Sequence, residues 1–322
     1  MIVLLHGTGD DNTKPEQWMQ WTQKLLEIHG EKVLNLPGIG SPEYNTIGDI
    51  SKAFVSSLTN RRYPGFSIAG FSAADPKLKA AISKAGKEMM EVTRVSPFQE
   101  EAAMERMCAE DKKRRMGKDG WLAEGIKLRA ALGTLCAMAY YHRTPAARPL
   151  RIIGHSRGGS AAMALHNLLC AMGFPIQQTL LLDPVHGIRK PVHKDYYTTV
   201  YQGNVTNLPA KVKKAVFSDQ IIKLGSPSAN LTNLPKLKKL KHGHMGKFIS
   251  FKDEHKKAGR AELVGRLEAY MKRVTPTGSV LDQMNGLFQV GNASPNPDQI
   301  TLFSEIFSTL LGVNYNTMLR KG

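Results

Sequence analysis

The stretch from Leu150 to Gly159, Leu-Arg-Ile-Ile-Gly-His-Ser-Arg-Gly-Gly, limits what this chain can fold into more than any other. A largely apolar run ends in Gly-x-Ser-x-Gly, and the small-residue helix pattern Ser160–Leu165 follows at once. This order predicts a strand, a sharp turn and a helix, with Ser156 at the tip of the turn. Glycines flank the serine because a Cβ would clash in so tight a turn. The stretch predicts a nucleophilic serine; the alternative is a solvent-exposed serine in an ordinary strand-to-helix turn.

Backbone N–H groups near Ser156 are candidates for stabilising an oxyanion that develops during acyl transfer. Arg157 opens the predicted helix, where the helix dipole favours negative charge. A second donor is expected in the loop His6–Thr8, which follows a short apolar strand near the start of the chain. Gly7 and Thr8 are the predicted donors, and an ordinary glycine-rich loop is the alternative. The Arg157 side chain is suited to a substrate phosphate or to pairing with an acidic neighbour.

A serine hydroxyl needs a histidine that accepts its proton and a carboxylate that orients this histidine. Asp183 is the best candidate for the acid, because it directly follows the next predicted strand at 178–182 and so lies near the serine at the same edge of the sheet. A turn aspartate before a proline is the alternative role. Asp219, after a plausible strand at 215–218, is the second candidate, and Asp195 is a weaker one.

Histidines that follow the acid in the chain are the candidates for the base. His186 and His193 lie so close to Asp183 in sequence that they would need an unusual loop. The segment His242-Gly-His-Met-Gly246 instead places two histidines in a glycine-rich loop before an apolar stretch. Such a loop suits an imidazole that swings over the serine; a metal-binding His-x-His pair or a solvated basic loop is the alternative. The residues alone leave both His242 and His244 open as the base.

The length of 322 residues fits one α/β domain with insertions, and the hydrophobic content of 42% is enough for a sizeable core. Residues 60–120 form a methionine-rich block that predicts a helical insertion between sheet elements. Long insertions of this kind often cover an active site, and methionines suit an adaptable apolar surface. A lipid-facing lid and extra helices packed on the sheet both remain open. Residues 275–322 are expected to form a C-terminal helical extension.

The net charge of +17 predicts attraction to anionic surfaces, such as phospholipid headgroups or nucleic acid. Between Gln220 and Lys252 there are seven lysines and no acidic residue. A basic soluble protein with no anionic partner is the alternative. No basic motif interleaved with aromatic residues is visible, so nucleic acid is not the expected partner.

Three cysteines without metal-type spacing indicate a reducing compartment, and we expect neither a metal nor a cofactor. No run of 18 apolar residues is present, so no transmembrane helix is expected. The apolar run at Ile2–Leu5 is too short for a signal peptide and lacks a basic leader. Cytoplasmic synthesis is therefore expected, and export would require a dedicated secretion machine.

Four short motifs together resemble the α/β-hydrolase domains of bacterial lipase effectors of type VI secretion, and of a related bacterial and fungal hydrolase family. They are His6-Gly-Thr-Gly9, Gly154-His-Ser-Arg-Gly158, Asp183-Pro-Val185 and His242-Gly-His-Met-Gly246. The resemblance extends over residues 1–250, but only as short, separate segments. It implies an α/β-hydrolase fold, with a mostly parallel central sheet flanked by helices, and His242 as the base. The family carries Asp where this chain has His244.

The resemblance and the residues together predict a serine esterase that hydrolyses acyl esters of lipids, as a lipase or phospholipase. Its triad would be Ser156, Asp183 and His242, or His244 in place of His242. The resemblance further implies a membrane surface, a secretion machine and a cognate immunity protein as partners. A soluble carboxylesterase, thioesterase or deacylase is the first alternative. A catalytically inactive basic binding protein on a hydrolase scaffold is the second.

Overall fold

The computed structural model describes part of the chain: residues 1–38, 41, 129–130, 132–134, 136–137, 140, 150–171, 176–184, 221–226, 236–248, 256–292 and 294–313. The predicted insertion at 60–120 lies outside the described residues, as do the candidates Asp195 and Asp219. His186 and His193 lie outside them too, and so do the last residues of the expected extension, 314–322.

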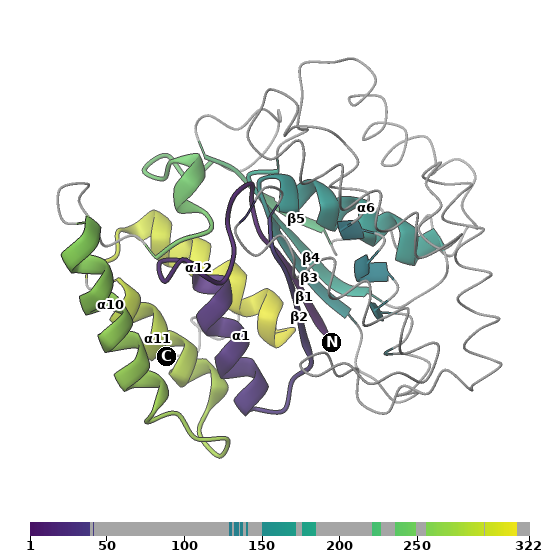
Figure 1. Cartoon of the computed structure of the whole chain (residues 1–322). Helices are drawn as coiled ribbons and strands as arrows, with labels where there is room; N and C mark the ends of the chain where they lie inside the picture. Colours follow the sequence, from purple (N-terminus) through teal and green to yellow (C-terminus); the bar gives the residue numbers. More distant parts are fainter. Residues whose placement is uncertain are drawn as a thin grey trace.

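Five parallel strands form the central sheet, in the order β2-β1-β3-β4-β5 (Figure 1). They are β1 (Ile2–Leu5), β2 (Val33–Leu36), β3 (Leu150–His155), β4 (Ile176–Leu182) and β5 (Ile221–Leu224). Every residue of β1 and β3 is buried, as expected for a sheet that helices cover on both faces. The predicted α/β class with a mostly parallel sheet flanked by helices is confirmed. The edge strand β5 was not predicted; it begins shortly after Asp219.

Helices lie on both sides of this sheet (Figure 1). On one side α6 (Arg157–Ala171) contacts β1, β3 and β4. The described residues between 129 and 140 are helical, and Gly133 among them lies against Leu165 of α6. None of the described helices is long and apolar enough to cross a bilayer.

On the other side lie α1 (Trp18–Ile28), α11 (Val280–Gly291) and α12 (Pro297–Leu311), while α10 (Lys256–Met271) packs on α11. The start of α12 follows from its sequence: the Asn296 side chain accepts a hydrogen bond from the Gln299 N–H, and Pro297 takes the first helical position. Its end follows as well, because Gly312 adopts a left-handed φ of 67°. Both helices of the predicted C-terminal extension therefore belong to the main body.

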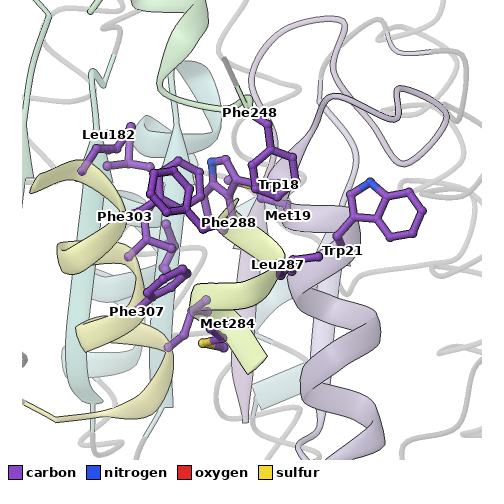
Figure 2. Packing of buried hydrophobic residues seen from close by; sticks show 14 of the residues in the cluster. Trp18, Met19, Trp21, Leu182, Phe248, Met284, Leu287, Phe288, Phe303 and Phe307 are labelled. Atoms are coloured by element: carbon purple, nitrogen blue, oxygen red, sulfur yellow. The ribbon is translucent and has the colours of Figure 1, made fainter. Parts of the chain in front are cut away.

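A cluster of aromatic rings joins these helices in the core (Figure 2). Phe303 of α12 lies at its centre, with its ring centroid 4.2 Å from that of Phe288 and 5.6 Å from that of Phe248. The Trp18 ring of α1 meets Phe303 edge-on at 6.4 Å. Aromatic pairs at such distances add to the free energy of burial. Because Phe248 follows His242 by six residues in the chain, this cluster connects the core to the candidate site.

We predict that Phe303→Ala lowers the free energy of unfolding by about 3–5 kcal/mol, because it leaves a cavity among these rings. Urea denaturation followed by circular dichroism measures the effect. Ile300→Ala is the matched control in the same helix, because Ile300 is 47% exposed whereas Phe303 is 1% exposed. The control should change stability by no more than about 0.5 kcal/mol. Equal losses in the two variants would contradict the central position of Phe303.

Candidate active site

The candidate site lies at the carboxyl edge of the sheet. The register of the parallel pairing places the carboxyl ends of β1, β3, β4 and β5 next to one another there. Leu5 of β1 is opposite Gly154 of β3, and Leu182 of β4 is opposite Leu224 of β5. The residues just beyond these ends are Gly7, Ser156, Asp183 and Ser226. Open α/β sheets bind ligands at this edge. Parallel pairing thus brings together groups that are far apart in the sequence.

The turn at Ser156 is held by close backbone contacts. Ser156 has a φ of 56°, a left-handed conformation that costs energy for a residue with a side chain. A Cβ on Gly154 would lie 2.2 Å from the Gly158 carbonyl oxygen, and one on Gly158 would lie 2.1 Å from the Leu5 carbonyl oxygen. Both positions therefore require glycine. The N-terminal turn of α6 lies directly against the end of β1 for the same reason.

Ser156, His242 and Asp183 are connected by hydrogen bonds in one continuous chain. The Ser156 hydroxyl donates to His242 Nε2, with Oγ and Nε2 2.9 Å apart. His242 Nδ1 is 2.9 Å from Asp183 Oδ2, so the ring donates its proton there to the carboxylate. These contacts satisfy the distance of about 2.6–3.2 Å that proton transfer requires. The structure therefore brings the three predicted catalytic side chains together.

His244, the other candidate for the base, points elsewhere. Its Nδ1 accepts a hydrogen bond from the Lys241 backbone N–H at 3.2 Å. Burial lowers the pKa of His244, and the charges of Lys241 and Lys247 lower it further. A metal role for the His-x-His pair receives no support from the described residues, in which no group of three or more His, Cys, Asp or Glu side chains could hold a metal ion.

The Asp183 carboxylate is buried and has two hydrogen-bond donors. Besides His242, the Ser226 hydroxyl donates to Oδ2 at 2.5 Å. Burial by itself raises the pKa of Asp183, but the hydrogen bonds from His242 and Ser226 outweigh it, so the pKa lies below its ordinary value. Asp183 also has a left-handed φ of 45°, and its N–H donates to the Leu224 carbonyl at 2.7 Å. Ser226 was not predicted, although its position after a short apolar strand is the signal that could have found it.

The loop that carries His242 is fixed to the start of α1 and to the core. The Trp18 indole Nε1–H donates to the Met245 carbonyl oxygen at 2.9 Å, and the Met245 side chain is completely buried. The Phe248 N–H donates to the Glu16 carbonyl oxygen at 2.8 Å. His242 itself forms the first residue of a short 3₁₀ turn, His242–His244, and its side chain is 39% exposed. Hydrogen bonds to the backbone of this loop, made away from Ser156, therefore set the position of the His242 imidazole.

His155, the residue before the serine, provides a further contact to this loop. Its Nε2 lies 3.0 Å from the His242 carbonyl oxygen, so Nε2 carries the proton and donates it. The ring is 3% exposed and lies between two glycines: a Cβ on Gly7 or Gly246 would come within 2.7 or 2.8 Å of His155 Nδ1. Burial lowers the pKa of His155 to about 4, so the ring is neutral near pH 7. The residue before Ser156 thereby holds the backbone of His242, the candidate base.

Two of the predicted oxyanion donors, Arg157 and Gly7, are placed beside Ser156 by the fold. Arg157 is the first residue of α6, a position whose backbone N–H points out of the helix N-terminus. Gly7 lies beside the serine, since a Cβ built on it would be 3.1 Å from Ser156 Cβ. Thr8 is exposed. The Arg157 side chain is buried, at 1% exposure, which disfavours the predicted contact with a substrate phosphate. The oxyanion role of these N–H groups stays a prediction.

No model of a protein family matches the chain, and no curated protein and no solved structure matches it either.

We predict that His155→Met slows the reaction of Ser156 with a fluorophosphonate probe by about tenfold or more. Methionine fills the space but cannot donate to the partly buried His242 carbonyl. The loss of a donor to a buried group costs about 1–3 kcal/mol. His155→Gln is the matched variant, because its amide can donate from nearly the same position and should restore most of the labelling rate. Mass spectrometry of the labelled protein measures both rates. Equal rates in the Met and Gln variants would contradict the importance of this hydrogen bond.

We predict that stability falls as the pH drops from about 6.5 to about 4. Burial lowers the pKa of His6, His155 and His166 from 6.5 to about 4 in the folded protein. Between these values the unfolded chain binds more protons than the folded one, so acid favours unfolding, and this contribution to stability is complete above pH 6.5. Urea denaturation from pH 7 to pH 4 should show the uptake of up to about three protons. His166→Gln should reduce this uptake by about one; an unchanged pH dependence in this variant would contradict the assignment.

Proposed function

We propose that this chain is a serine esterase, whose Ser156 attacks the carbonyl carbon of an acyl ester. The observation that carries the proposal is the hydrogen-bonded chain from Ser156 through His242 to Asp183, on a strand-turn-helix with a strained serine. Such a chain of three groups activates a hydroxyl that is otherwise a weak nucleophile. A binding protein would not need a serine held in a left-handed conformation against an imidazole.

The reaction would run in two halves with the same groups. In the first, Ser156 Oγ bonds to the carbonyl carbon while His242 Nε2 takes its proton, and the backbone N–H groups of Arg157 and Gly7 stabilise the oxyanion. His242 then gives this proton to the leaving alcohol as the ester bond breaks. In the second half a water attacks the acyl carbon of the acyl-enzyme and loses a proton to His242. His242 then gives this proton to Ser156 Oγ as the bond from Oγ to the acyl group breaks, and the free acid leaves.

Asp183 would keep the imidazole in the correct tautomer throughout the cycle. Its carboxylate accepts the Nδ1 proton, which leaves Nε2 unprotonated and facing the serine. Because the Asp183 pKa lies below its ordinary value, the carboxylate stays charged at neutral pH and stabilises the imidazolium that forms. The Ser226 hydroxyl occupies the same oxygen, Oδ2, and limits rotation of the carboxyl group.

A lipid ester is the substrate class that we favour. The net charge of +17 would attract the enzyme to anionic lipid headgroups, and the sequence motifs resemble those of lipase effectors. His242 is also 39% exposed on its side chain, so the base lies at the surface, where a substrate from a membrane can reach it. A soluble esterase or thioesterase with the same triad is the alternative. A comparison of short p-nitrophenyl esters with phospholipid vesicles separates the two, since a lipase works faster at an interface.

We predict that Ser156→Ala and His242→Ala each lower kcat for ester hydrolysis by at least about 10⁴-fold, because each removes a group that acts in bond formation. His244→Ala is the matched control: it changes the neighbouring histidine, whose ring does not face the serine. This control should keep kcat within about threefold of the parent. Hydrolysis of a p-nitrophenyl ester by the purified variants measures the effect. Full activity in Ser156→Ala, or greater loss in His244→Ala than in His242→Ala, would disprove the assignment.

A further inference from the structure

The segment Lys236–Lys241 presents lysines beside the candidate site in a fixed arrangement. Its sequence is Lys-Leu-Lys-Lys-Leu-Lys, and the four lysines are exposed while Leu237 and Leu240 are buried at 7% and 1% exposure. The two leucines belong to the main hydrophobic cluster, so they fix the segment to the core. A turn in which the Leu240 N–H donates to the Leu237 carbonyl at 3.1 Å directs the lysines outward. We call these four lysines the lysine strip.

The lysine strip borders the site at both of its ends. At its start, the Leu237 N–H donates to the Gly225 carbonyl at 2.8 Å, and Gly225 precedes the serine that holds Asp183. At its other end, Lys241 directly precedes His242. The strip therefore lies at the carboxyl edge of the sheet, next to the exposed imidazole of His242.

The charges of the lysine strip are available to an outside partner. In the part of the chain that the structure describes, none of these four lysines forms an ion pair with a carboxylate. Asp298 accepts a hydrogen bond from the Lys239 backbone N–H at 2.6 Å and helps to hold the strip. Lys247 differs, because it lies 3.7 Å from Glu16, and it is not counted in the strip. Unneutralised lysines that are rigidly displayed favour a polyanionic surface.

We propose that the lysine strip docks this protein on an anionic phospholipid membrane, with the candidate site facing the bilayer. This inference rests on the proposed esterase function, because it explains how a lipid ester reaches Ser156. The chemistry of the strip favours a membrane over nucleic acid: it contains lysines only, without the arginines and aromatic residues that read bases and phosphates in fixed geometry. Lysines act as point charges, which suits a fluid layer of headgroups.

The test uses Lys236→Gln/Lys238→Gln/Lys239→Gln in the Ser156→Ala background, so that no product forms during binding. Lys241 is left unchanged because it adjoins His242. The matched control is Lys24→Gln/Lys32→Gln/Lys272→Gln, which removes the same charge from three exposed lysines outside the strip. Lys32 directly precedes β2 and so lies at the amino edge of the sheet, opposite the site. Sedimentation with vesicles of phosphatidylcholine and phosphatidylglycerol, at about 0.1 M salt, measures binding.

The strip variant should bind these vesicles at least tenfold more weakly, because each lysine near an anionic surface contributes about fivefold. The control variant should lose no more than about threefold, and neutral phosphatidylcholine vesicles should bind both proteins weakly. Equal losses in the strip and control variants would overturn the proposal, since net charge alone would then explain binding. It would also be overturned if a DNA duplex bound the parent more tightly than the anionic vesicles and competed for the same lysines.

Two further measurements separate this proposal from the proposed function. With Ser156 intact, the strip variant should hydrolyse a short soluble ester within about twofold of the parent rate, but should lose at least tenfold on anionic vesicles. If the parent binds vesicles through the strip and hydrolyses no ester, docking stands and the esterase assignment fails. If the parent hydrolyses esters and the strip variant binds vesicles as the parent does, the esterase assignment stands and the docking proposal fails.

Discussion

The contact between Gly158 and the carbonyl oxygens at the end of β1 is the constraint on which the rest of the site depends. A Cβ on Gly158 would lie 2.1 Å from the Leu5 oxygen and 2.4 Å from the His6 oxygen, so only glycine permits the approach. The contact sets the N-terminus of α6 against the loop that follows β1. Ser156 and Gly7 are thereby placed side by side, and the left-handed backbone of the serine is kept in place by packing rather than by its own preference.

The position of the imidazole has a different physical origin from that of the serine. His242 belongs to a loop whose backbone is held by the Trp18 indole, by the Glu16 carbonyl and by the His155 ring. Met245 and Phe248 anchor the same loop in the aromatic cluster. Hydrogen bonds thus fix the direction of the loop, and apolar burial supplies most of the free energy that keeps it there.

The parts of this architecture that depend on local pattern could be predicted from the sequence. The strand, turn and helix around Ser156 follow from an apolar run, two glycines and small residues, and β1 follows from a short apolar run. The position of Asp183 followed from parallel pairing, because an acid after the next strand must lie at the same edge. The choice between His242 and His244 depended on tertiary contacts to Trp18 and His155, which no local pattern contains.

Other elements escaped prediction for physical reasons. The strand β5 has only four residues, Ile221–Leu224, one of which is a lysine, and so short an edge strand carries little periodicity. Ser226 depends on that strand and was missed with it. The helix α11 (Val280–Gly291) lies within the predicted helical extension, but its own bounds were not predicted, because its two glycines and one asparagine weaken its local helix propensity. The buried face of α11 packs against α1 and Phe303, and this burial stabilises the helix despite its weak propensity.

The aromatic cluster beneath the His242 loop has a consequence for the order in which the site is completed during synthesis. A nascent chain carries Ser156 and Asp183 well before the ribosome reaches Phe288 and Phe303, the rings against which the loop is packed. Until α11 and α12 have been made and have docked, the loop that carries His242 lacks the rings against which Phe248 packs. Ser156 is therefore the first member of the proposed triad to be translated, and the loop of the proposed base is packed only after helices that come much later in the chain.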